Sequence, residues 1–319
     1  MNVTAFSFFV IIVALTLGIT YWAARRNKST AEHYVAGGGI KGWQNGLAIT
    51  GDFVSVAGFF EIAGVVALTG FNGFYLAVGV PISFLMVLLV VAEPLRNLGK
   101  YTVADMITSR FRTKQVRSVA AISTLTISLV YMIAQFVGAG ILIQLLLGID
   151  YNVAVVAIGV LMTIYVLAGG MLATTWIQIS KAVLLMAATL YLFFLVLYNV
   201  GSNPVAVFDE AAAKIGDQAV LPPPPAGLIA GLDLLSLNLA IALGPVGLPH
   251  ILIRFLTVPD AKTARNSVLI AGFCIGVFFL ILLPIGYGAT IFVGRGQEGY
   301  TPFEEIYTKA NIGSEQTVN

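Results

Sequence analysis

Two short stretches interrupt segments that are otherwise apolar: TGDFVS at residues 50–55 and GPVGLPH at residues 244–250. Glycine and proline weaken or end a helix, so both stretches predict broken helices. Irregular backbone at the depth of a membrane is tolerated only where it lines a cavity or is buried in protein. Two such interruptions in corresponding halves of a chain are typical of a transporter's binding site. The pair therefore predicts a site for a small solute, coupled to a cation, within a membrane.

The composition is that of a membrane protein. Charged residues make up only 10% of the 319 residues, and the mean hydropathy is +0.93. A membrane-spanning helix needs about 20 apolar residues. Eight stretches of the chain meet this requirement, and they lie near residues 3–24, 44–69, 72–92, 117–147, 152–170, 176–200, 233–253 and 266–294.

The basic residues predict the orientation of these spans. Arg25, Arg26 and Lys28 follow the first apolar run, which argues against a cleaved signal peptide and places the N-terminus outside. With alternating topology, 14 of the 17 Lys and Arg residues fall on the inside, among them Lys181, and three fall outside. This agrees with the positive-inside rule and predicts a multi-pass protein of the cell membrane.

The connections differ in character. The inside segment 93–116 is basic, and residues 103–112 are expected to form a short amphipathic element. The outside segment 201–232 contains four consecutive prolines at 222–225, which favour a stiff extended spacer. The tail 295–319 is polar and contains no span.

The two interrupted spans run in opposite directions if the topology alternates. If each opens a five-helix repeat, residues 44–200 form a complete first repeat and residues 233–294 only begin an inverted second one. The membrane domain is then residues 1–294, and the chain is expected to be the N-terminal part of something longer.

Six stretches carry a resemblance to a known family through their order and spacing. They are EHYVAGGG at residues 32–39, NGLAITGDF at 45–53, LGKYTVAD at 98–105, AQFVGAG at 134–140, GGMLATTW at 169–176 and GLPHILIRF at 247–255. The chain resembles the sodium:solute symporters, and within them the acetate and monocarboxylate permeases. The resemblance implies an all-α fold of five plus five inverted helices with one extra N-terminal helix, here ending after about eight spans. It also implies sodium-coupled symport of a short monocarboxylate such as acetate.

The first interruption is the candidate cation site. Unwound carbonyls and the C-terminal ends of half-helices supply oxygen ligands to a cation. The resemblance implies the carbonyls of Gly51 and Val54, and the hydroxyl of Ser55 lies beside them. The competing interpretation is a helix kinked for packing, with Ser55 bonded to its own backbone.

Asp52 belongs to the same candidate cation site. An intramembrane carboxylate costs about 2.5–3.5 kcal/mol to insert, which makes it a functional candidate. It is expected to shape the field around the cation, exchange a proton, pair with a cation on another helix, or cap the half-helix. Glu61 is a second acid, half a turn out of phase with Asp52, where the acetate permeases usually have glycine. Its candidate roles are proton carrier, substrate contact or buried protonated acid.

The expected substrate path combines several helices. Thr124, Ser128, Tyr131 and Gln135 are spaced to share one helical face. The second interruption adds His250, either a proton sensor or a hydrogen-bonded structural residue, and Arg254, expected to anchor the span at the membrane boundary. The residues expected to line the path are Gly58, Tyr131, Gln135, Gly244, Gly247 and His250.

Other functional classes find little support in the chain. No metal-spaced histidine cluster, phosphate loop or nucleophile elbow is present in the sequence, so no enzyme, no cofactor other than the coupling ion and no nucleic-acid partner are expected. The expected partners are a small organic anion, sodium and the lipid bilayer. Two alternatives stay open: a solute-sensing membrane domain of a signalling protein, and an inactive fragment of a symporter.

Overall fold

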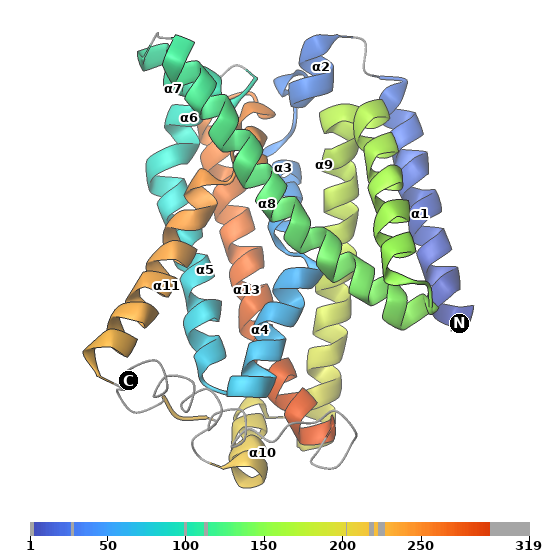
Figure 1. Ribbon diagram of the computed structural model, residues 1–319, viewed down its shortest axis with the longest axis vertical. Coiled ribbons are helices and arrows are strands. Elements are labelled where there is room, and N and C mark those ends of the chain that lie inside the picture. Colours follow the sequence, from blue (N-terminus) through green and yellow to red (C-terminus); the bar gives the residue numbers. More distant parts are fainter. Residues whose placement is uncertain are drawn as a thin grey trace. The chain divides into compact units, whose positions relative to one another are not determined.

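The computed structural model describes residues 3–26, 29–98, 101–111, 114–201, 203–216, 220–222 and 227–293, and these residues form helices and connections without a strand. The elements are shown in Figure 1. They are α1 (Val3–Ala24), α2 (Thr30–Val35), η1 (Ala36–Gly38), α3 (Gly42–Phe53), α4 (Val56–Thr69), α5 (Asn72–Met86), η2 (Val87–Val91), α6 (Ala92–Leu98), α7 (Val103–Arg110), α8 (Lys114–Leu147), α9 (Tyr151–Val200), α10 (Pro204–Ile215), α11 (Leu228–Gly247), α12 (Pro249–Leu252), η4 (Ile253–Leu256) and α13 (Ala261–Val293). The predicted tail 295–319 lies outside the described residues.

Six of these helices are long and apolar enough to cross a membrane, and α3 with α4 forms a broken seventh span. Eight spans were predicted, and α9 accounts for two of them. This helix has 50 residues, which at 1.5 Å per residue is far longer than a bilayer core of about 30 Å. Gly170 interrupts it with φ 58° and ψ −158°, and the chain turns back there (Figure 1). The two arms of α9 correspond to the predicted spans 152–170 and 176–200.

The chain divides into two compact units that alternate along the sequence. The first unit contains residues 1–57, 83–184 and 243–274, and the second contains residues 58–82, 185–242 and 275–319. Both α9 and α13 contribute to each unit. The units therefore differ from the predicted repeats, and the division into residues 44–200 and 233–294 stays a prediction.

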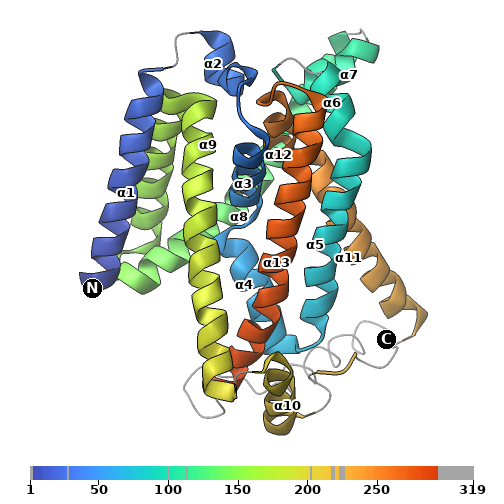
Figure 2. The same ribbon diagram turned by 180° about the vertical axis from the view of Figure 1, so that it is seen from behind.

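In the first unit, α3 is held between α9 and the first half of α13. Figure 2 shows α3 lying along α13. The contact is close because Gly46 of α3 faces Ile270 and the carbonyl of Ser267, with no room for a side chain. Asn45 of α3 accepts a hydrogen bond at 3.1 Å from Thr257, which precedes α13. These contacts fix the helix that carries the first interruption.

In the second unit, the aromatic ring of Tyr287 is the centre of a buried cluster. Phe74 of α5 and Phe208 of α10 pack against it, with ring centroids 6.3 and 5.3 Å away. Lys214 of α10 also donates to the carbonyl of Ile291 at 3.3 Å. The short helix α10 is therefore packed onto α13.

Two connections show how local signals compare with the structure. The amphipathic element expected at residues 103–112 is confirmed as α7, which Thr102 and Asp105 begin with a capping box. The expected spacer at residues 201–232 instead contains α10. Asn203 caps α10 and Pro204 occupies its first turn, and this Asn-Pro signal predicts a helix start. Three of the four prolines of residues 222–225 lie outside the described residues.

Gly170→Ala tests the break in α9. The φ and ψ of Gly170 are accessible only to glycine at low cost, so the alanine variant should lose about 1–3 kcal/mol of stability. The measurement is the thermal unfolding midpoint of the purified chain in detergent. The matched control is Gly159→Ala in the same helix, where a Cβ would meet only the Phe136 ring at 3.8 Å. Equal midpoints for the two variants would show that the turn at Gly170 carries no strain for alanine.

Candidate functional site

The break between α3 and α4 is narrower than the sequence predicts. α3 continues to Phe53, and Val54 leaves the helix with φ −71° and ψ 109°. The amide of Val54 donates to the carbonyl of Thr50 at 2.8 Å. The carbonyls that follow lie beyond the hydrogen-bond ladder of α3, as at any helix C-terminus. Val54 and Ser55 are buried, so the predicted interruption at residues 50–55 is confirmed, with its non-helical part at these two residues.

Asp52, in the last turn of α3, forms a buried ion pair with Arg254 of η4. The guanidinium donates twice, from Nε to Oδ2 at 2.5 Å and from Nη2 to Oδ1 at 3.0 Å. The side chains are only 7% and 3% exposed, respectively. Of the roles considered for Asp52, pairing with a cation on another helix is confirmed. The expectation that Arg254 anchors the span at the membrane boundary is wrong, because its side chain points into the protein.

The remaining edge of the Arg254 guanidinium faces α9. Nη1 donates to the hydroxyl of Thr175 at 2.8 Å and lies 3.5 Å from the sulfur of Met171. Thr175 in turn donates to the carbonyl of Met171 at 2.8 Å. A buried charge is tolerated when it is paired and its other donors are satisfied. Arg254 meets both conditions and joins α3, α9 and η4. Sequence reasoning missed Thr175, which has no distinguishing signal in an apolar helix.

Gly51 brings the backbone of α3 against α9. A Cβ at this position would overlap the carbonyl of Gln178, so only glycine allows the approach. The last turn of α3 is therefore packed directly against the second arm of α9. The membership of Gly51 in a cation site stays a prediction.

His250 and Gln178 each contribute a buried polar atom to the first unit. The His250 ring packs on the Tyr131 ring at a centroid distance of 4.4 Å. Its Nε2 atom and the Oε1 atom of Gln178 are buried and have no hydrogen-bond partner among the described residues. The interpretation of His250 as a hydrogen-bonded structural residue is therefore not supported at Nε2. Buried polar atoms of this kind are normally bonded to protein, water or a ligand.

Lys181 is a further member of this group that sequence reasoning missed. The charge count assigns it to an inside connection, but the structure places it within α9, one turn after Gln178. It interacts electrostatically with Asp52 and Arg254, and His250 interacts with all three. An ionisable residue within an apolar span indicates a functional site, and Lys181 in the apolar run after residue 176 is a signal of this kind.

The second interruption is confirmed within the predicted residues 244–250. Gly244 and Gly247 stay helical in α11, and the break falls at Leu248, with φ −74° and ψ 113°. Leu248 precedes Pro249, and helical backbone is disfavoured for the residue before a proline. Gly244 precedes Pro245 inside α11, where the helix continues. The assignment of both glycines to the solute path stays a prediction.

The other predicted residues belong to α8 and α4. Gln135 is half-buried on α8, where Thr124 is also half-buried and Ser128 is exposed. Gly58 and Glu61 belong to α4 in the second unit. The Glu61 side chain lies on the exposed side of α4, and its role stays a prediction.

Comparison with known proteins identifies the family. The model of the sodium:solute symporter family matches residues 33–316. The chain belongs to this family. It is 56% identical to an uncharacterized symporter, YwcA, of Bacillus subtilis (strain 168) over 294 residues, which are 92% of this chain and 57% of the relative. The chain thus spans a little over half the length of that relative, whose substrate its name does not give.

A solved structure shows the same fold. The sodium:solute symporter chain matches a Na⁺-coupled sialic acid symporter, in a substrate-bound outward-open state, with a TM-score of 0.75. The match covers 95% of this chain and 64% of the solved one, at 15% identity. The predicted all-α inverted-repeat transporter fold is confirmed. Membership in a family of transporters also agrees with the expectation that the chain is not an enzyme.

A double-mutant cycle measures the ion pair. Arg254→Met or Asp52→Ala alone leaves a buried charge unpaired and should each lower stability by about 3–5 kcal/mol. The double variant should lose less than the sum of the two, measured by unfolding in mixed micelles. The control cycle uses Arg265 and Glu93, which are exposed and 3.9 Å apart, and should show a coupling of about 0–1 kcal/mol. Additive losses at residues 52 and 254 would contradict the pairing.

Gly51→Ala tests the contact between α3 and α9. The added methyl group must displace the backbone of Gln178, which is costly in a packed interior, so the thermal midpoint in detergent should fall by several degrees. Gly231→Ala in α11 is the control, because no atom lies within 4 Å of a Cβ there. A Gly51→Ala chain as stable as the control would exclude the close approach.

Proposed function

We propose that the chain forms the principal part of a sodium-coupled symporter that takes up a short monocarboxylate such as acetate through the cell membrane, with its N-terminus outside. Membership in the sodium:solute symporter family supports cation coupling. The observation that carries the site is the end of α3, where a buried helix break lies beside a neutralised carboxylate. The inward sodium gradient would drive uptake.

The cation is assigned to the break itself. The carbonyls of Gly51 and Val54 lie at the negative end of the α3 dipole, and Ser55 adds a hydroxyl. Each oxygen of Asp52 already accepts from Arg254, so we give Asp52 a positioning role that holds the last turn of α3. The positive charge of Arg254 also cancels the carboxylate charge, which leaves the backbone oxygens as the main cation ligands.

Two features support an anionic solute. A bare Asp52 carboxylate would repel an anion, but Arg254 compensates it at 2.5 Å. His250 Nε2 is buried without a partner beside Tyr131, and it is a donor or acceptor for a carboxylate according to its protonation. We therefore place the solute path along Tyr131 and His250, with Gln135 on the same helix face as Tyr131.

The remaining assignments are proposals of the same kind. Gly58 on α4, and Gly244 and Gly247 on α11, are assigned to the path because residues without side chains leave room for a solute. Glu61 is exposed on α4 and is retained as a proton carrier or charge site.

Sodium-dependent uptake of labelled acetate into proteoliposomes tests the function. Ser55→Ala should raise the half-saturating sodium concentration about ten-fold, because a hydrogen-bonding group to a charge contributes about 1.5–3 kcal/mol. Asp52→Ala should abolish sodium stimulation by releasing Arg254 beside the cation. Ser7→Ala on α1, where the hydroxyl bonds its own helix at 2.9 Å, is the control and should behave as wild type.

Three results would count against parts of this proposal. Sodium-stimulated uptake that is indifferent to both substitutions would exclude the cation site at the α3 break. Sodium-stimulated uptake of solutes other than monocarboxylates would exclude the substrate class alone. Uptake that does not respond to sodium in the wild-type chain would exclude sodium coupling.

A further inference from the structure

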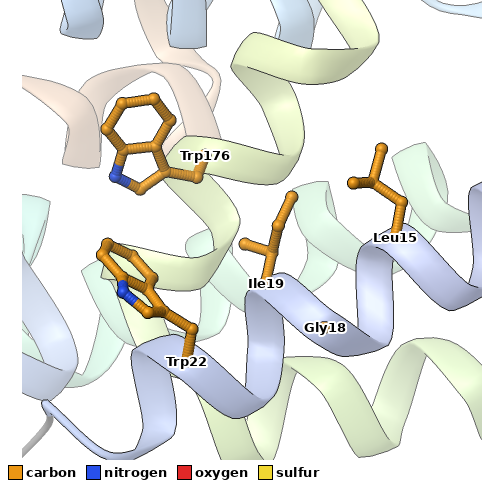
Figure 3. A pocket seen from close by; sticks show the side chains of 5 residues that line it. All are labelled: Leu15, Gly18, Ile19, Trp22 and Trp176. Atoms are coloured by element: carbon orange, nitrogen blue, oxygen red, sulfur yellow. The ribbon is translucent and has the colours of Figure 1, made fainter.

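A hollow of about 430 Å³ lies between α1 and the second arm of α9, away from the residues discussed above (Figure 3). Leu15, Gly18, Ile19 and Trp22 of α1 line it together with Trp176 of α9. The α1 residues are spaced three, one and three apart, which places them on one face of the helix. The lining is apolar throughout, so the hollow suits a hydrocarbon chain.

The walls of the hollow are specific side chains. Trp22 and Trp176 meet edge to face with ring centroids 6.4 Å apart and close one end. Gly18 forms the floor, since no atom lies within 4 Å of a Cβ built there. α1 is fixed by its neighbouring face, where Thr20 and Ala23 are buried and Thr20 lies beside Gly169 of α9. The hollow is thus a groove at the edge of a packed helix contact.

Two arginines continue the same face of α1 beyond the groove. Arg25 and Arg26 follow Trp22 by three and four residues, and both are exposed. The Arg26 guanidinium lies 4.3 Å from the ring centre of Trp22, and that of Arg25 lies 4.4 Å from the ring centre of Tyr21. No described carboxylate is within 4.0 Å of either guanidinium, so their charge is available to an anion.

We propose that this groove binds an anionic phospholipid, with one acyl chain along Leu15, Gly18 and Ile19 and the phosphate at Arg25 and Arg26. A groove within the bilayer is open to lipid and closed to water-soluble ligands. Basic residues next to a membrane helix attract anionic headgroups. The tryptophans mark the interfacial depth, where their rings are favoured. A lipid held there would bridge α1 and α9.

Tryptophan quenching by brominated lipids tests this site directly. The chain has three tryptophans, and Trp43→Phe leaves only Trp22 and Trp176, both of which line the groove. This variant is reconstituted with phosphatidylglycerol or phosphatidylcholine carrying the same brominated acyl chains. Two basic residues predict a roughly thirty-fold preference for phosphatidylglycerol in competition with unbrominated phosphatidylcholine.

Two further variants separate the headgroup from the groove. Arg25→Gln with Arg26→Gln should remove the preference and leave quenching by both lipids equal. Gly18→Leu fills the floor and should lower quenching by both, whereas Gly231→Leu, an equally open glycine of α11, should change neither. Circular dichroism confirms that each variant is folded.

The proposal has clear contrary outcomes. Equal quenching by the two lipids in the Trp43→Phe chain would mean that only unselective bilayer lipid touches α1. A preference that survives loss of both arginines would place the headgroup elsewhere. Unchanged quenching in Gly18→Leu would show that the acyl chain does not enter the groove. None of these three quenching measurements depends on transport, so the lipid site and the proposed symport are tested separately.

Discussion

The buried ion pair between Asp52 and Arg254 organises the first unit. In an apolar protein a carboxylate and a guanidinium are each costly alone, and together they are tolerated because both oxygens of Asp52 accept hydrogen bonds. The pair fixes the last turn of α3 against η4, and Thr175 extends the contact to α9. The place where α3 ends is therefore determined by electrostatics as well as by packing.

Close backbone packing complements this pair. At Gly51 the carbonyl of Gln178 occupies the space where a side chain would be, and the ion pair of Asp52 begins at the next residue. Small residues allow close approach of membrane helices, and polar contacts then hold them together. The combination leaves the carbonyls after Thr50 at a buried helix end.

Local sequence signals predicted some elements better than others. The apolar runs, the break near Val54 and the short amphipathic helix α7 could be predicted because each depends on neighbouring residues. The second break also lies within the predicted residues 244–250, at Leu248 before Pro249, whereas Gly244 and Gly247 stay helical. The prediction that Arg254 is a boundary anchor was wrong because Arg254 and Asp52 are far apart along the chain. No local pattern indicates that their side chains are in contact.

The sequence by itself determined a multi-pass helical protein of the sodium:solute symporter family, because hydropathy and ordered motifs are properties of the chain alone. Only the tertiary structure decided which polar groups meet. It joined Asp52 to Arg254 across 202 positions, placed Lys181 and His250 beside them, and opened a groove at Gly18. The physical reason is that a buried charge requires a partner in space, and the partner's position along the chain carries no signal.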